Sequence, residues 1–231
     1  MIDALGPTEW AAIRLSLLVA VVATLCALPF AIAVAYILAR KVFPGRQLLN
    51  GLVHLPLVLP PVVTGYLLLV LFGNQGPIGA LLLDTFGVTL AFRWTGAALA
   101  AAIMAFPLMV RAIRLAIEAM PDGLEQAAAT LGASRRRIFT TILLPMILPG
   151  ILAGAVLGFA KALGEFGATI TFVAAIPGQT QTIPSAIYGL LQVPGQEPAI
   201  VALVVFSIIF AMGALLASEW LGHRMARRVG R

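Results

Sequence analysis

The segment "LEQAAATLGASRRRIFTTILLP", residues 124–145, is a polar island near the middle of a very apolar chain. It holds a carboxylate, a glycine and three consecutive arginines at 135–137, whereas long runs of Leu, Ile, Val and Ala flank it. Of the 231 residues, 61% are hydrophobic and only 10% are charged. Soluble domains carry roughly 25% charged residues. We therefore expect the chain to lie in a membrane, with the island in a loop between spans.

Working outward from the island, five segments are long and apolar enough to cross a bilayer as helices. They are residues 13–39, 52–72, 95–117, 138–163 and 199–221. Two shorter apolar stretches, 78–92 and 166–176, are interpreted as external interfacial or partly re-entrant pieces. The predicted fold class is all-α, a polytopic membrane protein with five transmembrane helices.

The basic residues predict the orientation of these spans. They gather after the first span, in the central loop and in the C-terminal tail: Arg40, Lys41, Arg46, Arg111, Arg114, Arg135, Arg136, Arg137, Arg224, Arg227, Arg228 and Arg231. Short loops rich in Lys and Arg stay in the cytoplasm. This predicts an outside N-terminus and a cytoplasmic C-terminus, although Arg14 argues weakly against it. Because the net charge of +6 is spread between spans, we expect a lipid bilayer and no nucleic acid as partner.

Motifs for nucleotide, metal or catalytic chemistry are absent from the sequence. There is no G-x-x-x-x-G-K-[ST] loop, so the chain is not expected to bind ATP by that device. His54 and His223 are far apart and there is one cysteine, so no metal site and no cofactor are predicted. Neither G-x-S-x-G nor H-E-x-x-H occurs, which makes an enzyme improbable.

The island itself predicts a short helix. Asp122 with Glu125 resembles a capping box at its start, Gly132 can end it, and Ser134 can cap the next helix. One face of this helix carries residues at i, i+3, i+4 and i+7: Leu124, Ala127, Ala128 and Leu131. Physical reasoning alone leaves two interpretations open, a helix packed on its own protein and a helix that docks on a partner.

The island resembles the EAA loop of ABC-importer permeases, whose pattern is E-A-A, three residues, G, nine residues, then I-x-L-P. Gln126-Ala127-Ala128, Gly132 and Ile142-Leu143-Leu144-Pro145 match at those spacings, with Gln126 replacing the first glutamate. The resemblance implies a coupling helix that docks into a cleft of a separate ATPase, present in two copies, which holds ATP and Mg. The implied coupling residues are Leu124, Glu125, Gln126, Ala127, Ala128, Leu131 and Gly132.

Other stretches widen this resemblance to nearly the whole chain. "HLPLVLPPVVTGYLLL" (54–69), "MAFPLMVRAIRLAIE" (104–118), "ALGEFGATITFVAAIPG" (162–178) and "TQTIPSAIY" (180–188) resemble bacterial molybdate ABC permeases. Sulfate/thiosulfate and tungstate permeases are the alternatives. The resemblance implies a type I ABC importer permease (MetI-like) fold in the cell inner membrane, fed by a periplasmic oxyanion-binding protein. It implies one permease domain over 1–231, with a cytoplasmic coupling loop at about 118–137.

Candidate translocation residues lie in two stretches. Prolines in the second span free backbone carbonyls, which are tolerated where they line a cavity, and polar groups cluster around residue 165. The candidates are Pro60, Pro61, Thr64, Lys161, Gly164, Glu165, Gly167 and Thr169. A packing kink at the prolines and a local Lys161–Glu165 ion pair remain the alternative interpretations.

A doubly charged oxyanion needs an aqueous path, because one bare buried charge costs tens of kcal/mol by Born estimates. Five helices enclose such a path poorly, so we expect a homodimer with the path on its two-fold axis. The competing class is a secondary transporter or channel that works without ATP. Such proteins commonly carry inverted repeats, and the sequence shows no internal repeat.

Overall fold

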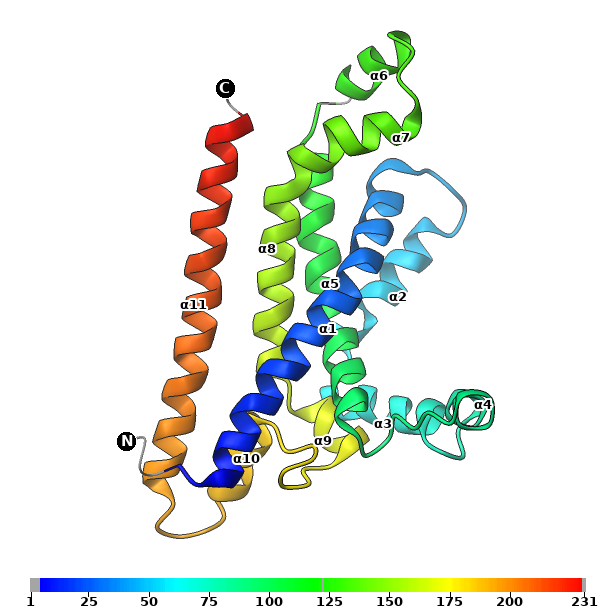
Figure 1. The fold of residues 1–231 in the computed structure, drawn as a ribbon. Helices are drawn as coiled ribbons and strands as arrows, with labels where there is room; N and C mark the ends of the chain where they lie inside the picture. Colours follow the sequence, from blue (N-terminus) through cyan, green and yellow to red (C-terminus); the bar gives the residue numbers. More distant parts are fainter. Residues whose placement is uncertain (1–4, 122, 230–231) are drawn as a thin grey trace.

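A computed structural model describes residues 5–121 and 123–229, and every regular element within these ranges is a helix. Four long helices stand side by side: α1 (Pro7–Arg40), α5 (Trp94–Glu118), α8 (Leu144–Leu163) and α11 (Glu197–Val229) (Figure 1). In the described part of the chain, four helical stretches are long and apolar enough to cross a membrane, or five if one bent pair counts as a span. The predicted all-α, membrane-spanning fold is confirmed.

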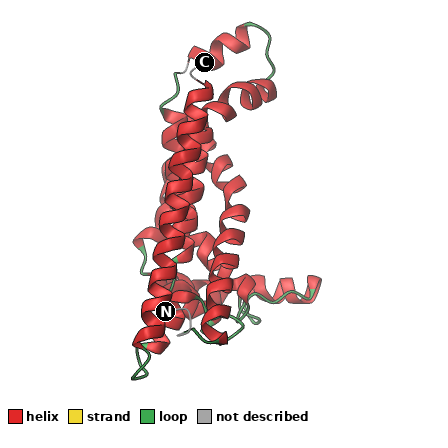
Figure 2. Cartoon of the chain, turned by 60° about the vertical axis from the view of Figure 1, so that its left-hand side comes forward, coloured by secondary structure: helices red, strands yellow, loops and turns green. Residues whose placement is uncertain are grey.

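Short helices gather at the two ends of this bundle (Figures 1 and 2). At one end lie α6 (Gly123–Thr130), α7 (Arg135–Ile138) and a π-helical turn, η2 (Phe139–Leu143), and the last turns of α11 reach the same end. At the other end lie α3 (Pro61–Phe72), α4 (Pro77–Phe86), α9 (Gly167–Val173) and α10 (Ile183–Leu190). The basic loops and the bare loops of the sequence thus lie at opposite ends.

The second predicted span is not continuous. Residues 52–72 are divided between α2 (Arg46–Val58) and α3, whose axes differ by 112°. Pro60 has extended backbone and Pro61 is the first residue of α3. Two successive prolines lack N–H donors and push the residue before each of them out of the α region, which ends α2. The other four predicted spans are confirmed. Residues 13–39, 95–117 and 199–221 lie within α1, α5 and α11, and 138–163 runs from the end of α7 through η2 and α8.

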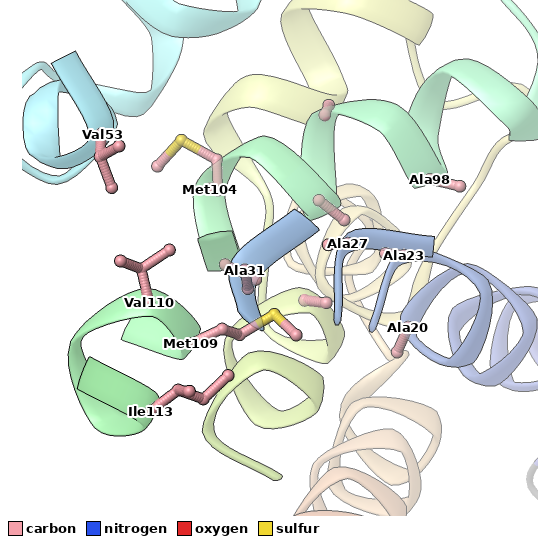
Figure 3. Packing of buried hydrophobic residues seen from close by; sticks show 14 of the residues in the cluster. Ala20, Ala23, Ala27, Ala31, Val53, Ala98, Met104, Met109, Val110 and Ile113 are labelled. Carbon is pink, nitrogen blue, oxygen red and sulfur yellow. The ribbon is translucent and has the colours of Figure 1, made fainter. Parts of the chain in front are cut away.

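Small side chains allow the long helices to pack closely, as is usual between membrane helices. In α5, 61% of the most apolar window is buried, against 17% in α11, so α5 is the central helix. One face of α1 carries buried alanines, Ala20, Ala23, Ala27, Ala31 and Ala35. Figure 3 shows the first four near residues of α5. Larger residues of α5 fill the space beside them.

Three glycines spaced by four residues, Gly150, Gly154 and Gly158, form the face of α8 that meets α5. A Cβ added at Gly154 would lie 3.1 Å from Ile113 Cγ1, and one added at Gly158 would lie 2.6 Å from Met109 Sδ. The glycines therefore set the distance between the two helices. We call this face the glycine ridge of α8. Through it, α8, which follows the polar island, packs against the central helix α5.

The stretch 166–176 is buried or half-buried within the chain, and its interpretation as an external interfacial or partly re-entrant piece stays a prediction. Ala168, Phe172 and Val173 of α9 are fully buried, and α9 packs against α3 and α5. Its apolar residues find partners in the chain's own core, which sequence periodicity over seven residues cannot reveal. By contrast, α4 projects sideways from the bundle with Leu81 and Phe86 exposed, and its interfacial role stays a prediction (Figure 2).

Candidate functional site

The short helix predicted in the polar island is α6, and its C-terminus has the hydrogen bonds of a Schellman motif. Gly132 has φ +81°, its N–H donates to Ala129 O at 3.0 Å, and Ala133 N–H donates to Ala128 O at 3.1 Å. Ser134 Oγ accepts from Arg137 N–H at 3.3 Å and so caps α7. The predicted helix end and the second cap are confirmed. Asp122, the predicted first cap, lies outside the described residues.

The apolar face of α6 is turned away from the bundle. Leu124 and Leu131 are 41% and 88% exposed, Ala127 is exposed and Ala128 is partly so. Among the described elements, α6 packs mainly on α7 and η2. It projects beyond the end of the bundle (Figure 1). The face that the sequence assigns to docking is therefore available to a partner.

A π-helical turn joins the α6–α7 pair to the membrane helix α8. Thr140 Oγ1 donates to Arg136 O at 3.0 Å and Thr141 Oγ1 donates to Arg137 O at 2.6 Å. Pro145, just beyond, has no N–H to give to the carbonyl four residues earlier, which favours a local change of helical pitch. The threonine hydroxyls bind two carbonyls of this irregular stretch. The turn is the covalent connection between the α6–α7 pair and α8.

At the opposite end, the structure brings together the two groups of candidate translocation residues. A Cβ on Gly167 would lie 2.7 Å from Pro61 Cβ, and one on Gly65 would lie 2.9 Å from Thr171 Cβ. The start of α3 and α9 are thus in close contact just after the bend at Pro60. Thr64 is buried, and its hydroxyl has no hydrogen bond within the described part of the chain.

Lys161 and Glu165 form the local ion pair, with Nζ and Oε2 2.7 Å apart. Glu165 is 2% exposed, and its other carboxylate oxygen accepts from Ala168 N–H at 3.0 Å, so both oxygens are engaged. The Thr169 hydroxyl donates to Phe166 O at 2.9 Å, and Gly164 N–H donates to Ala160 O at 3.2 Å. These groups are held by local bonds, and their contact with an anion stays a prediction.

The chain has a bundle of membrane-length helices, with the exposed helix α6 at one end and the bend between α2 and α3 at the other. These features are those of a polytopic membrane transport protein. A family model for the inner membrane component of binding-protein-dependent transport systems matches residues 27–229. The chain belongs to this family.

Relatives within the family are molybdenum and sulfate transport system permeases. The chain is 60% identical to the molybdenum transport system permease protein ModB of Escherichia coli (strain K12), over 96% of this chain and 97% of the relative. It is 58% identical to the protein of the same name in Haemophilus influenzae, over 96% and 97%. It is 37% identical to the sulfate transport system permease protein CysT of Salmonella typhimurium, over 97% and 80%.

Solved structures show the same fold at low sequence identity. A bacterial alginate ABC transporter in complex with an alginate pentasaccharide-bound periplasmic protein aligns with TM-score 0.74 and 19% identity, over 95% of this chain and 80% of that one. The MetNI methionine ABC transporter aligns with TM-score 0.68 and 14% identity, over 94% of both chains. The fold is that of type I ABC importer permeases.

Proposed function

We propose that this chain is the permease subunit of an ATP-driven importer for molybdate. The observation that carries the proposal is its 60% identity, over nearly the full length, to a molybdenum transport permease, against 37% to a sulfate permease. The chain serves as a transport subunit rather than an enzyme, and ATP with Mg is held and hydrolysed by a separate subunit. Tungstate and sulfate remain the alternative cargoes.

The complex is proposed to contain two copies of this chain, two ATPase subunits and a periplasmic binding protein. A bundle of five helices would enclose a polar path poorly, so a two-fold axis between two copies is the expected route. Closure of the ATPases on ATP would draw the two α6 helices together. Through η2 and the glycine ridge of α8, that motion would reach α5 and open the path outward. The whole chain, 1–231, acts as one permease domain in this proposal.

Ser134→Cys, made after Cys26→Ala, is expected to react with a membrane-impermeant thiol reagent only after the cells are opened. The reason is that the basic loops, α6 and the last turns of α11 share one end of the bundle, which we assign to the cytoplasm. Asn74→Cys, in the exposed turn before α4 at the other end, is the matched control and should be labelled in intact cells. Labelling of position 134 from outside would reverse the assigned orientation, including the outside N-terminus.

Vesicles reconstituted with the permease, its ATPase and the binding protein are expected to take up molybdate only when ATP is supplied. Tungstate should compete, because it is a tetrahedral dianion of nearly the same size, whereas sulfate should compete at least about tenfold less well, a difference of about 1.4 kcal/mol. The measurement is uptake of radiolabelled molybdate with each competitor. Equal competition by sulfate would reassign the cargo, and uptake without ATP would favour a secondary transporter or channel.

A further inference from the structure

A second polar cluster lies between α2 and α5, toward the α6 end of the bundle, and none of the candidate translocation residues belongs to it. Its residues line a cavity of about 280 Å³: Asn50, His54, Arg111, Arg114, Leu115 and Glu118. Arg111 is seven residues before the end of α5, which places it about 10 Å inside that end at 1.5 Å per residue.

Part of this cluster is held in place by internal bonds. Arg114 Nε donates to Glu118 Oε1 at 2.7 Å, and Arg114 Nη1 donates to Asn50 Oδ1 at 2.9 Å, which ties α5 to α2. His54 Nδ1 lies 2.8 Å from Asn50 O. Because a carbonyl oxygen can only accept, Nδ1 carries the proton and Nε2 is the nitrogen left for another group. These bonds account for Glu118, Asn50 and one side of Arg114.

Arg111 is not accounted for by these bonds. It is exposed on the cavity, and no hydrogen bond or ion pair joins it to any residue of the described ranges. A guanidinium has five N–H donors and no acceptor. Arg111 therefore offers five donors and Arg114, which uses two, offers three more. The single carboxylate of the cluster already faces Arg114, so the cavity has a net positive charge.

We propose that this cavity is a binding site for a tetrahedral oxyanion at the cytoplasmic end of the helix bundle, with Arg111 as its main ligand and Arg114 as a second. Guanidinium groups bind oxyanions through paired N–H donors, and such charge-assisted bonds are about twice as strong as neutral ones. Liquid water occupies roughly 30 Å³ per molecule, so the cavity admits one such anion with some of its water.

Two sources could supply this anion, the cargo on its way to the cytoplasm and the phosphate of an inner-leaflet lipid. Both present the same tetrahedral oxygens to Arg111. The choice of molybdate as the first probe rests on the proposed function, whereas the site itself rests on the cavity and its unpaired arginine. An arginine that only extended to the membrane interface would bind neither anion selectively.

The experiment compares wild type with Arg111→Gln, Arg111→Lys and a control, Arg93→Gln, which removes an exposed arginine at the opposite end of the helix bundle. Each full-length permease is purified with its ATPase and placed in nanodiscs of phosphatidylcholine alone. Molybdate, sulfate and phosphate binding is then measured by equilibrium dialysis. Arg111→Gln is expected to weaken oxyanion binding about tenfold, the equivalent of one charge-assisted hydrogen bond, while Arg111→Lys loses less and Arg93→Gln loses nothing.

A second arm uses nanodiscs that contain phosphatidylglycerol and assays the lipid phosphorus that stays with the protein. If a lipid phosphate occupies the site, anionic lipid weakens molybdate binding to wild type, and Arg111→Gln removes the retained lipid. The proposal is overturned if Arg111→Gln and Arg93→Gln behave alike toward all three anions and toward lipid, with ATPase co-purification unchanged. Arg111-dependent binding of sulfate but not molybdate would keep the site and reject the proposed cargo instead.

Discussion

Ala128→Trp is expected to abolish ATP-driven uptake while the permease still inserts and dimerises. Ala128 lies on the α6 face that also carries Leu124 and Leu131, and this face is turned away from the chain's own bundle. Alanines at its centre let a partner surface approach closely, and an indole there would hold the ATPase cleft away. The measurements are pull-down of the ATPase subunit and vesicle uptake, and we expect both to fall by at least about tenfold, or about 1.4 kcal/mol of docking free energy.

Gly132→Asp should give the same loss for a different reason. Gly132 has φ +81°, and an added Cβ would contact nothing within 4 Å. The substitution therefore destabilises the helix end through backbone strain and not through a steric clash. A side chain with Cβ resists this left-handed conformation by about 1–2 kcal/mol, and the Schellman bonds that end α6 would be lost with it. Gly132→Asn is the matched variant, because asparagine is the residue that is found beside glycine at this position of helix ends.

Ala129→Trp is the control for size. It adds the same ring on the other side of α6, where residue 129 is exposed. It should leave ATPase binding and uptake close to wild type. Size-exclusion chromatography establishes that every variant is folded and dimeric. If Ala128→Trp and Gly132→Asp bind the ATPase and transport normally, α6 is an ordinary surface helix and the docking role is rejected.

Local sequence signals predicted the local structure well. Gly132 can adopt the left-handed conformation that ends a helix, and the Ser134 hydroxyl can cap the start of the next helix. Both the helix end and the helix start lie where these residues predict them. The i,i+4 spacing of Lys161 and Glu165 likewise predicted their ion pair. The mean apolar character of long segments located four of the five spans without help from tertiary structure.

Features that depend on partners distant in the sequence were missed. The double proline at 60 and 61 predicts a kink within one span, whereas the angle of 112° between α2 and α3 also depends on the packing of α3 on α9, which is distant in the sequence. Stretch 166–176 was too short for its pattern to reveal burial. The bond between Arg114 and Asn50 joins residues 64 positions apart, and nothing in either local sequence indicates it.

Lys161→Met is expected to destabilise the permease and to slow uptake, and the two effects can be separated through Glu165. Removing one partner of a buried ion pair leaves an uncompensated charge and costs about 3–5 kcal/mol. The cost here should lie at or below the lower end, because the Lys161 side chain is 29% exposed while that of Glu165 is 1% exposed. Thermal unfolding of the purified protein, followed by size-exclusion chromatography, measures this loss.

The double variant Lys161→Met with Glu165→Gln leaves no charge unpaired, and the glutamine carbonyl can still accept from Ala168 N–H as Glu165 Oε1 does at 3.0 Å. We expect it to recover the wild-type unfolding temperature, because the buried carboxylate is gone. Uptake should stay about tenfold slower if Lys161 also offers its charge to the passing anion, which corresponds to about 1.4 kcal/mol of lost transition-state stabilisation. Glu165→Gln alone is the control, since Lys161 keeps its charge and reaches water. Recovery of both stability and uptake in the double variant would show that Lys161 serves only to neutralise Glu165.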